Sequence, residues 1–98
     1  MSPSDQHIKV ADQPDHSRYE IELDGRPVGL LSYRLADGVI THRHTEIDPS
    51  VGGRGLGSSL VRFALDDARA RGLTVKPQCP FVAAFIVSHP QYAGLVAS

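Results

Sequence analysis

The sequence predicts a single α+β domain, an α/β sandwich in which two main helices pack on a mixed, mostly antiparallel sheet. Up to Ile47, short runs alternate apolar and polar residues, as strands with one buried face do. After Leu56 the apolar period becomes helical, and a further short strand follows. A strand–helix–strand connection of this kind implies one parallel pairing in the sheet. A chain of 98 residues suits one domain, 1–98, rather than two.

Four strands are expected in the first half of the chain, separated by turn sequences. They cover His7–Ala11, Tyr19–Leu23, Val28–Leu35 and Val39–Ile47. Asp24-Gly25 is a strong hairpin signal between the second and third strands. Gly29 is expected to mark close packing or a bulge. Residues 1–6 are expected to be disordered.

The second half predicts two helices around one short strand. The first helix is expected over Leu56–Arg71, with i,i+4 charge pairs Arg62–Asp66 and Asp67–Arg71 on its outer face. The strand is expected at Leu73–Val75, and the second helix at Phe81–Ser88 after Pro80. The apolar face of the first helix is Leu56, Leu60, Val61, Ala64, Leu65 and Ala68.

Composition excludes several classes of function. A net charge of −1 without a basic stripe argues against nucleic-acid binding. No apolar run approaches the ~20 residues needed to cross a membrane, and the polar first residues lack a signal-peptide core, so a cytoplasmic location is expected. A single cysteine forms no internal disulfide, and the histidines show no paired metal-ligand spacing, so no metal site is expected.

The stretch Gly52–Ser58 is the strongest functional signal in the chain. Four glycines from Gly52 to Gly57 directly precede the helix. First-turn N–H groups have no intrahelical partners and carry the positive end of the helix dipole, so this loop suits a phosphate or pyrophosphate. A nucleotide P-loop is disfavoured because Ser58 stands where it needs lysine. A Rossmann fingerprint is disfavoured because Leu60 stands where it needs glycine. A purely structural glycine loop remains an alternative.

This loop, placed after an antiparallel meander and before a helix, resembles the acetyl-CoA pyrophosphate loop of GNAT-type N-acetyltransferases. That loop has the form Gln/Arg-x-x-Gly-x-Gly/Ala, which Gly55 and Gly57 match, whereas Gly52 occupies the Gln/Arg position. Arg54 is expected to supply the charge instead. The resemblance extends to a small GNAT-like subfamily of short chains with a Cys-Pro-Phe motif. It rests on His44–Pro49, Gly53–Gly57, Ala68–Leu73, Cys79–Ile86 and His89–Tyr92.

The resemblance implies a minimal GNAT-like fold that binds acetyl-CoA as cosubstrate. A V-shaped opening between two neighbouring parallel strands would hold the pantetheine arm, whose amides would pair with the backbone near Ile47. The pyrophosphate would lie on the loop, with binding residues Gly52, Gly53, Arg54, Gly55, Leu56, Gly57 and Ser58.

Three side chains are candidates for the chemistry. Cys79 precedes a helix, where a thiolate is stabilised; the alternative is a buried, inert cysteine. The resemblance favours a position at the thioester. Glu46 and His44 are spaced to share one strand face, with His42 and Ile40 behind them, and either could deprotonate an amine. The alternative for that face is a solvated surface.

These observations favour an acetyl-CoA-dependent N-acetyltransferase acting on an amine of unknown identity, carried by a small molecule or a protein. One alternative is a non-catalytic acyl-CoA-binding module, and another is a structural domain with an empty loop. No nucleic-acid or membrane partner is expected, and the chain is expected to be a monomer or a weak homodimer.

Overall fold

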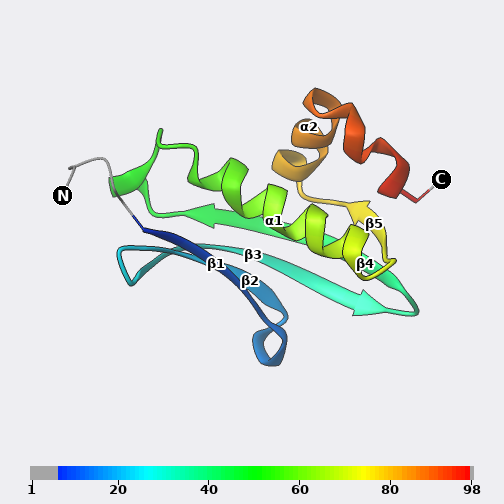
Figure 1. The fold of residues 1–98 in the computed structure, drawn as a ribbon, viewed down its shortest axis with the longest axis horizontal. Helices are drawn as coiled ribbons and strands as arrows, with labels where there is room; N and C mark the ends of the chain where they lie inside the picture. Colours follow the sequence, from blue (N-terminus) through cyan, green and yellow to red (C-terminus); the bar gives the residue numbers. More distant parts are fainter. Residues whose placement is uncertain (1–6, 98) are drawn as a thin grey trace.

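The computed structural model describes residues 7 to 97, so the disorder expected for residues 1–6 lies outside the described residues. Five strands form one sheet, and α1 lies along it with the C-terminal helices beside it (Figure 1). The elements are β1 (Ile8–Gln13), β2 (Arg18–Leu23), β3 (Arg26–Ala36), β4 (Val39–Ile47), α1 (Leu56–Ala70), β5 (Thr74–Pro77) and α2 (Pro80–Ser88). Short 3-10 helices cover Pro14–His16, Pro49–Val51 and Pro90–Leu95.

The sheet has the predicted mixed topology. Its strand order is β1-β2-β3-β4-β5, with three antiparallel pairings and a parallel pairing of β4 with β5 across the α1 connection. The predicted β4 is confirmed at both ends, and the Asp24-Gly25 hairpin joins β2 to β3. The last strand was expected to end at Val75, but it continues to Pro77, because Lys76 and Pro77 still pair with β4.

Two bulges interrupt the antiparallel ladders. On β3, Ile21 pairs with Gly29 but Glu22 pairs with Pro27, so Val28 is one extra residue. A side chain at Gly29 would meet its neighbours, because a Cβ there would lie 2.7 Å from the Glu46 carbonyl oxygen. Both expectations for Gly29, close packing and a bulge, are therefore confirmed.

The second bulge lies in β4. Ser32 pairs with His44, but Tyr33 pairs with His42, which leaves Arg43 as the extra residue. Because strand side chains alternate between the two faces, one inserted residue reverses the alternation beyond it. Residues after Arg43 therefore face the opposite way from the positions that simple alternation assigns to them.

The hydrophobic core lies between α1 and one face of the sheet. All six residues predicted for the apolar face of α1 are buried. From the sheet, Tyr19, Ile21, Leu31 and Ile40 are completely buried against them. No helix within residues 7–97 combines the length and the apolar character needed to span a membrane.

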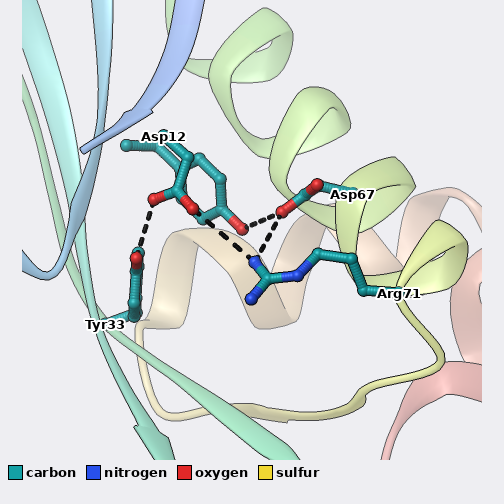
Figure 2. Close-up of polar contacts among 5 residues, drawn as sticks. Asp12, Tyr33, Asp67 and Arg71 are labelled. Carbon is teal, nitrogen blue, oxygen red and sulfur yellow. Dashed lines mark hydrogen bonds and ion pairs between the residues drawn. The ribbon is translucent and has the colours of Figure 1, made fainter. Parts of the chain in front are cut away.

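A polar network fastens α1 to the strands at one edge of this core (Figure 2). The Tyr19 hydroxyl donates to Asp67 Oδ2, and the Tyr33 hydroxyl donates to Asp12 Oδ1, each at 2.7 Å. Arg71 lies between the two carboxylates, 3.1 Å from Asp67 and 3.6 Å from Asp12. The predicted Asp67–Arg71 pair thus forms, but as part of an interface between α1 and the sheet rather than on a solvated face.

The other predicted pair, Arg62–Asp66, does not form. Asp66 instead accepts a hydrogen bond of 2.7 Å from the Tyr92 hydroxyl and lies 4.0 Å from Arg69. The Arg62 guanidinium lies 5.5 Å from the centre of the Phe85 ring. Tertiary partners from the C-terminal segment therefore replace the weak pair within the helix.

Candidate functional site

Strand β4 runs on beyond its neighbour β5. Their parallel pairing begins at Val39 and ends where His42 meets Pro77. From Arg43 to Ile47, β4 has no strand partner on its β5 side within residues 7–97. Unpaired backbone N–H and C=O groups along such an edge are free to bind an extended ligand.

Two prolines explain why the strands separate here. Pro77 lacks an N–H group and cannot donate to a continuing ladder. Pro80 occupies the first turn of α2, where its fixed φ suits a helix start. Between them the Cys79 N–H donates to the His42 carbonyl oxygen at 2.9 Å, a main-chain hydrogen bond to β4 just beyond the end of β5. Cys79 therefore lies at the point where the two strands part.

At the far end of β4, the glycine loop leads into α1. Gly55 is the N-cap and adopts a left-handed conformation with φ of 73°, which favours glycine. The first intrahelical bond runs from the Ser59 N–H to the Gly55 carbonyl oxygen at 3.1 Å. Among the described residues, the backbone N–H groups of Leu56, Gly57 and Ser58 have no hydrogen-bond acceptor. These three donors and the helix dipole make the loop suitable for an anion.

The remaining loop residues differ in what they offer. Gly52, Gly53 and Arg54 are exposed. The Leu56 side chain is buried in the core, so this residue offers a ligand only its backbone. Ile47 lies at the end of β4, partly buried against the core.

Contact between α1 and α2 brings the loop close to the cysteine segment. A Cβ at Gly57 would lie 2.9 Å from Cζ of Phe81, so the ring packs directly on this glycine. Phe81 stands two residues after Cys79, in the first turn of α2. The N-terminal ends of the two helices are therefore neighbours, and the structure brings the predicted loop and Cys79 to the same side of the sheet.

Cys79 is buried, and its closest polar neighbour was missing from the sequence prediction. Its Sγ lies 3.3 Å from Oγ1 of Thr45 on β4. Burial raises the pKa of the Cys79 thiol, but Thr45 and the N–H groups of Phe81 and Val82 outweigh it, so the pKa lies below its ordinary value. Thr45 faces Cys79 only because of the Arg43 bulge, which alternation alone does not reveal.

The expectation for His44 and Glu46 is half right. Their side chains share a face, with His44 Nε2 and Glu46 Oε2 3.3 Å apart and each side chain 63% exposed. They do not share it with His42 and Ile40, which are both completely buried on the helix side. The bulge turns His44 and Glu46 to the open face, opposite Cys79. The structure thus forms two candidate groups on opposite faces of the sheet.

His42 is a buried histidine, and its burial was not predicted from the sequence. Its side chain is fully buried, and neither ring nitrogen has a hydrogen-bond partner within residues 7–97. Burial lowers the pKa of His42 from 6.5 to about 4, so the ring is neutral near pH 7. It lies at the end of the β4–β5 pairing, beside the bulge.

Comparison with models of known protein families gives one match. A family model described as GCN5-related N-acetyl-transferase matches residues 18–95. The chain belongs to this GCN5-related N-acetyltransferase family. No curated protein sequence matches it significantly. The family match spans both the glycine loop and the segment around Cys79, and these enzymes act on amine acceptors.

Solved structures of GCN5-related N-acetyltransferases share the fold. A GCN5-like N-acetyltransferase candidate from Staphylococcus aureus is similar with a TM-score of 0.68 at 22% identity, covering 97% of this chain and 91% of that one. The ribosomal-protein-S18-alanine N-acetyltransferase of Escherichia coli gives 0.62 at 13% identity, covering 88% and 76%. An aminoglycoside N-acetyltransferase in complex with CoA gives 0.60 at 12% identity, covering 100% and 93%. At these identities the likeness establishes the fold alone.

Proposed function

We propose that this protein transfers the acetyl group of acetyl-CoA to an amine, with the pyrophosphate on Gly52–Ser58 and the pantetheine arm along the edge of β4. One observation carries the proposal: the unpaired edge, Arg43–Ile47, starts beside Cys79 and is joined to the glycine loop by the single 3-10 turn Pro49–Val51. This edge extends over about 13 Å at the usual rise of a strand. Three of the similar structures are complexes with CoA, which supports this assignment.

In this proposal the end of the edge near Cys79 and Thr45 holds the thioester. The amine nitrogen attacks the thioester carbonyl carbon, the C–S bond breaks, and the CoA thiolate leaves. Glu46 or His44 takes the proton that the amine loses, because both side chains are exposed on the open face from which an acceptor would approach. The proton that the thiolate requires comes from solvent or from the Cys79 thiol.

The first experiment measures the melting temperature with and without excess acetyl-CoA. Binding to the native state alone raises stability by ~2.7 kcal/mol at 100 times the dissociation constant. Gly52→Glu places a negative charge in the loop at a position without positive φ or a steric clash. Gly94→Glu adds the same charge in the C-terminal 3-10 helix, where a Cβ meets no atom within 4 Å. The shift should vanish in the first variant and remain in the second; no shift in the unmodified protein would refute the proposal.

A non-catalytic acyl-CoA-binding module is a second candidate, favoured by the placement of Cys79 and the His44–Glu46 pair on opposite faces. Release of free CoA in the presence of a panel of amines separates the two functions. The transferase predicts turnover that falls in Cys79→Ser and when His44 and Glu46 are both replaced by Gln, while acetyl-CoA binding is retained. The binding module predicts acetyl-CoA binding without turnover in any of these proteins.

A further inference from the structure

A basic pocket lies on the open face of the sheet. It has a volume of about 250 Å³ and is lined by Arg34, Thr41, Arg43, Lys76 and Gln78. Three of these five side chains are cationic, and none is acidic. This concentration of positive charge occurs in a chain whose net charge is −1.

The strand register explains how three cations meet. Arg34 on β3 pairs with Thr41 on β4, and Thr41 pairs with Lys76 on β5. These residues form one row across three neighbouring strands, spaced by about 4.8 Å. Arg43, the extra residue of the bulge, closes the pocket on the side towards His44.

None of the three cations forms an ion pair in the described structure. Within residues 7–97, no carboxylate lies within 4.0 Å of Arg34, Arg43 or Lys76. Other arginines do pair, for example Arg18 with Glu20 at 2.7 Å. Asp37 lines an adjoining hollow that shares Arg34 and Lys76 but forms no ion pair with either of them. Guanidinium groups bind carboxylates and phosphates by paired hydrogen bonds, and a neighbouring ammonium adds to the attraction.

The bulge places this pocket beside the candidate general base. Because it reverses the alternation after Arg43, His44 and Glu46 lie on the same open face as the pocket. Because Arg43 is an extra residue, the register places Thr41 two β3 residues from His44 and four from Glu46, about 7 Å and about 14 Å at the usual strand rise. These distances correspond to about two to four residues of an extended peptide. A ligand anchored in the pocket would thus present an amine to His44 and Glu46 if anion and amine were separated by a few residues.

We propose that the pocket is an acceptor subsite, and that the acceptor is a peptide or protein segment with an acidic residue about three positions from the acetylated amine. This inference rests on the proposed acetyltransferase function and adds its substrate class. The oxyanion is a carboxylate or a phosphorylated side chain. Arg34, Arg43 and Lys76 hold it, and Glu46 or His44 takes the proton of the amine.

The test uses short peptides with one free amine and matched residues at the third and fourth positions from it. These positions carry Glu-Glu, phosphoserine-Ala, Gln-Gln or Lys-Lys. Acidic peptides should have a kcat/KM about tenfold above that of the Gln-Gln peptide, equivalent to 1.4 kcal/mol. The difference should lie in KM and should shrink at high salt. The carboxylate and phosphoserine peptides show which oxyanion is preferred.

Variants connect the preference to the pocket. Arg43→Gln and Lys76→Gln should remove most of the preference, and Arg43→Glu should shift it towards the Lys-Lys peptide. Lys9→Gln removes the same charge from β1, away from the pocket, and should leave the preference unchanged. Equal kcat/KM for all four peptides would overturn this inference while leaving the proposed acetyltransferase function intact.

A binding measurement decides the inference without turnover. Fluorescence anisotropy with labelled peptides and CoA present should show the same order of affinity, lost in Arg43→Gln. An acidic peptide that binds no better than the Gln-Gln peptide would overturn the inference. Arg43→Gln could instead raise the dissociation constant for acetyl-CoA and leave peptide affinity unchanged. That result would assign the pocket to the cosubstrate and would also overturn the inference. Failure of acetyl-CoA to bind at all would instead contradict the proposed function.

Discussion

The Thr45 hydroxyl and the Cys79 thiol lie 3.3 Å apart, on two elements that separate immediately beyond them. Thr45 belongs to β4 after its last β5 partner, and Cys79 is the N-cap of α2. Their contact links β4 to the start of α2 where β4 and β5 separate. It also gives the buried thiol a polar neighbour. Thr45 therefore helps to lower the pKa of the Cys79 thiol.

Thr45→Val should raise the pKa of the Cys79 thiol. The hydrogen bond from Thr45 opposes the effect of burial, which by itself raises this pKa. Without it, the thiolate fraction at neutral pH falls and alkylation by a small reagent slows. The measurement is the alkylation rate as a function of pH. Thr74→Val, a change on β5 without contact to the thiol, is the control, and an unchanged pH profile in Thr45→Val would contradict the assignment.

His42 should make the protein less stable in mild acid. The unfolded chain binds a proton on this ring near pH 6.5, whereas the folded protein resists it until about pH 4. Stability is thus fully present above pH 6.5 and falls as the pH drops towards 4, by about 3 kcal/mol. His42→Leu should remove this loss in urea unfolding measured across that range. His16→Gln, at an exposed histidine, should keep it.

The network in Figure 2 should contribute measurably to stability. Tyr19→Phe removes the donor to Asp67 and leaves that partly buried carboxylate with Arg71 alone. Hydrogen bonds to charged groups contribute about 1.5–3 kcal/mol, and each kcal/mol lowers the Tm of a domain this size by about 4–8 °C. Calorimetry of Tyr19→Phe checks the loss. Asp67→Asn keeps an acceptor for Tyr19 and should cost less, so an equal cost would argue against this arrangement.

Gly57 and Phe81 should show strong coupling in a double-mutant cycle. Alanine at position 57 would place its Cβ 2.9 Å from the Phe81 ring, so Gly57→Ala should destabilise the protein. With Phe81→Ala the obstacle is gone, and the same change should stabilise α1 by up to ~1 kcal/mol because alanine favours helices over glycine. Urea unfolding of the four proteins measures this reversal. Additive effects would show that the ring does not pack on Gly57.

Sequence patterns predicted the elements well where one local signal decides them. Alternation located β4 at both ends, Asp24-Gly25 identified the hairpin, and the helical period identified every buried residue of α1. The glycine loop was also found correctly at the start of α1. In each case the deciding residues are close together in the sequence.

The arrangement of the catalytic candidates was harder to predict because one inserted residue controls it. Nothing in the local pattern around Arg43 distinguishes a bulge from a regular strand, so His44 and Glu46 were expected on the face of His42. Thr45 was missed for the same reason, since regular alternation places it away from Cys79. The separation of β4 from β5 depends on tertiary pairing that only the folded chain shows.

The strand order of the sheet, which follows the order of the chain, has a consequence for folding. The antiparallel pairings β1–β2, β2–β3 and β3–β4 each close a short loop, whereas β5 reaches β4 only after the glycine loop and the whole of α1 have been ordered. Longer loop closure costs more entropy and slows contact formation. We therefore expect the meander to form first and β5 with α2 to dock last. In hydrogen exchange the segment that carries Cys79 should open most readily, which would give this end of the sheet a mobility that the rest of the sheet lacks.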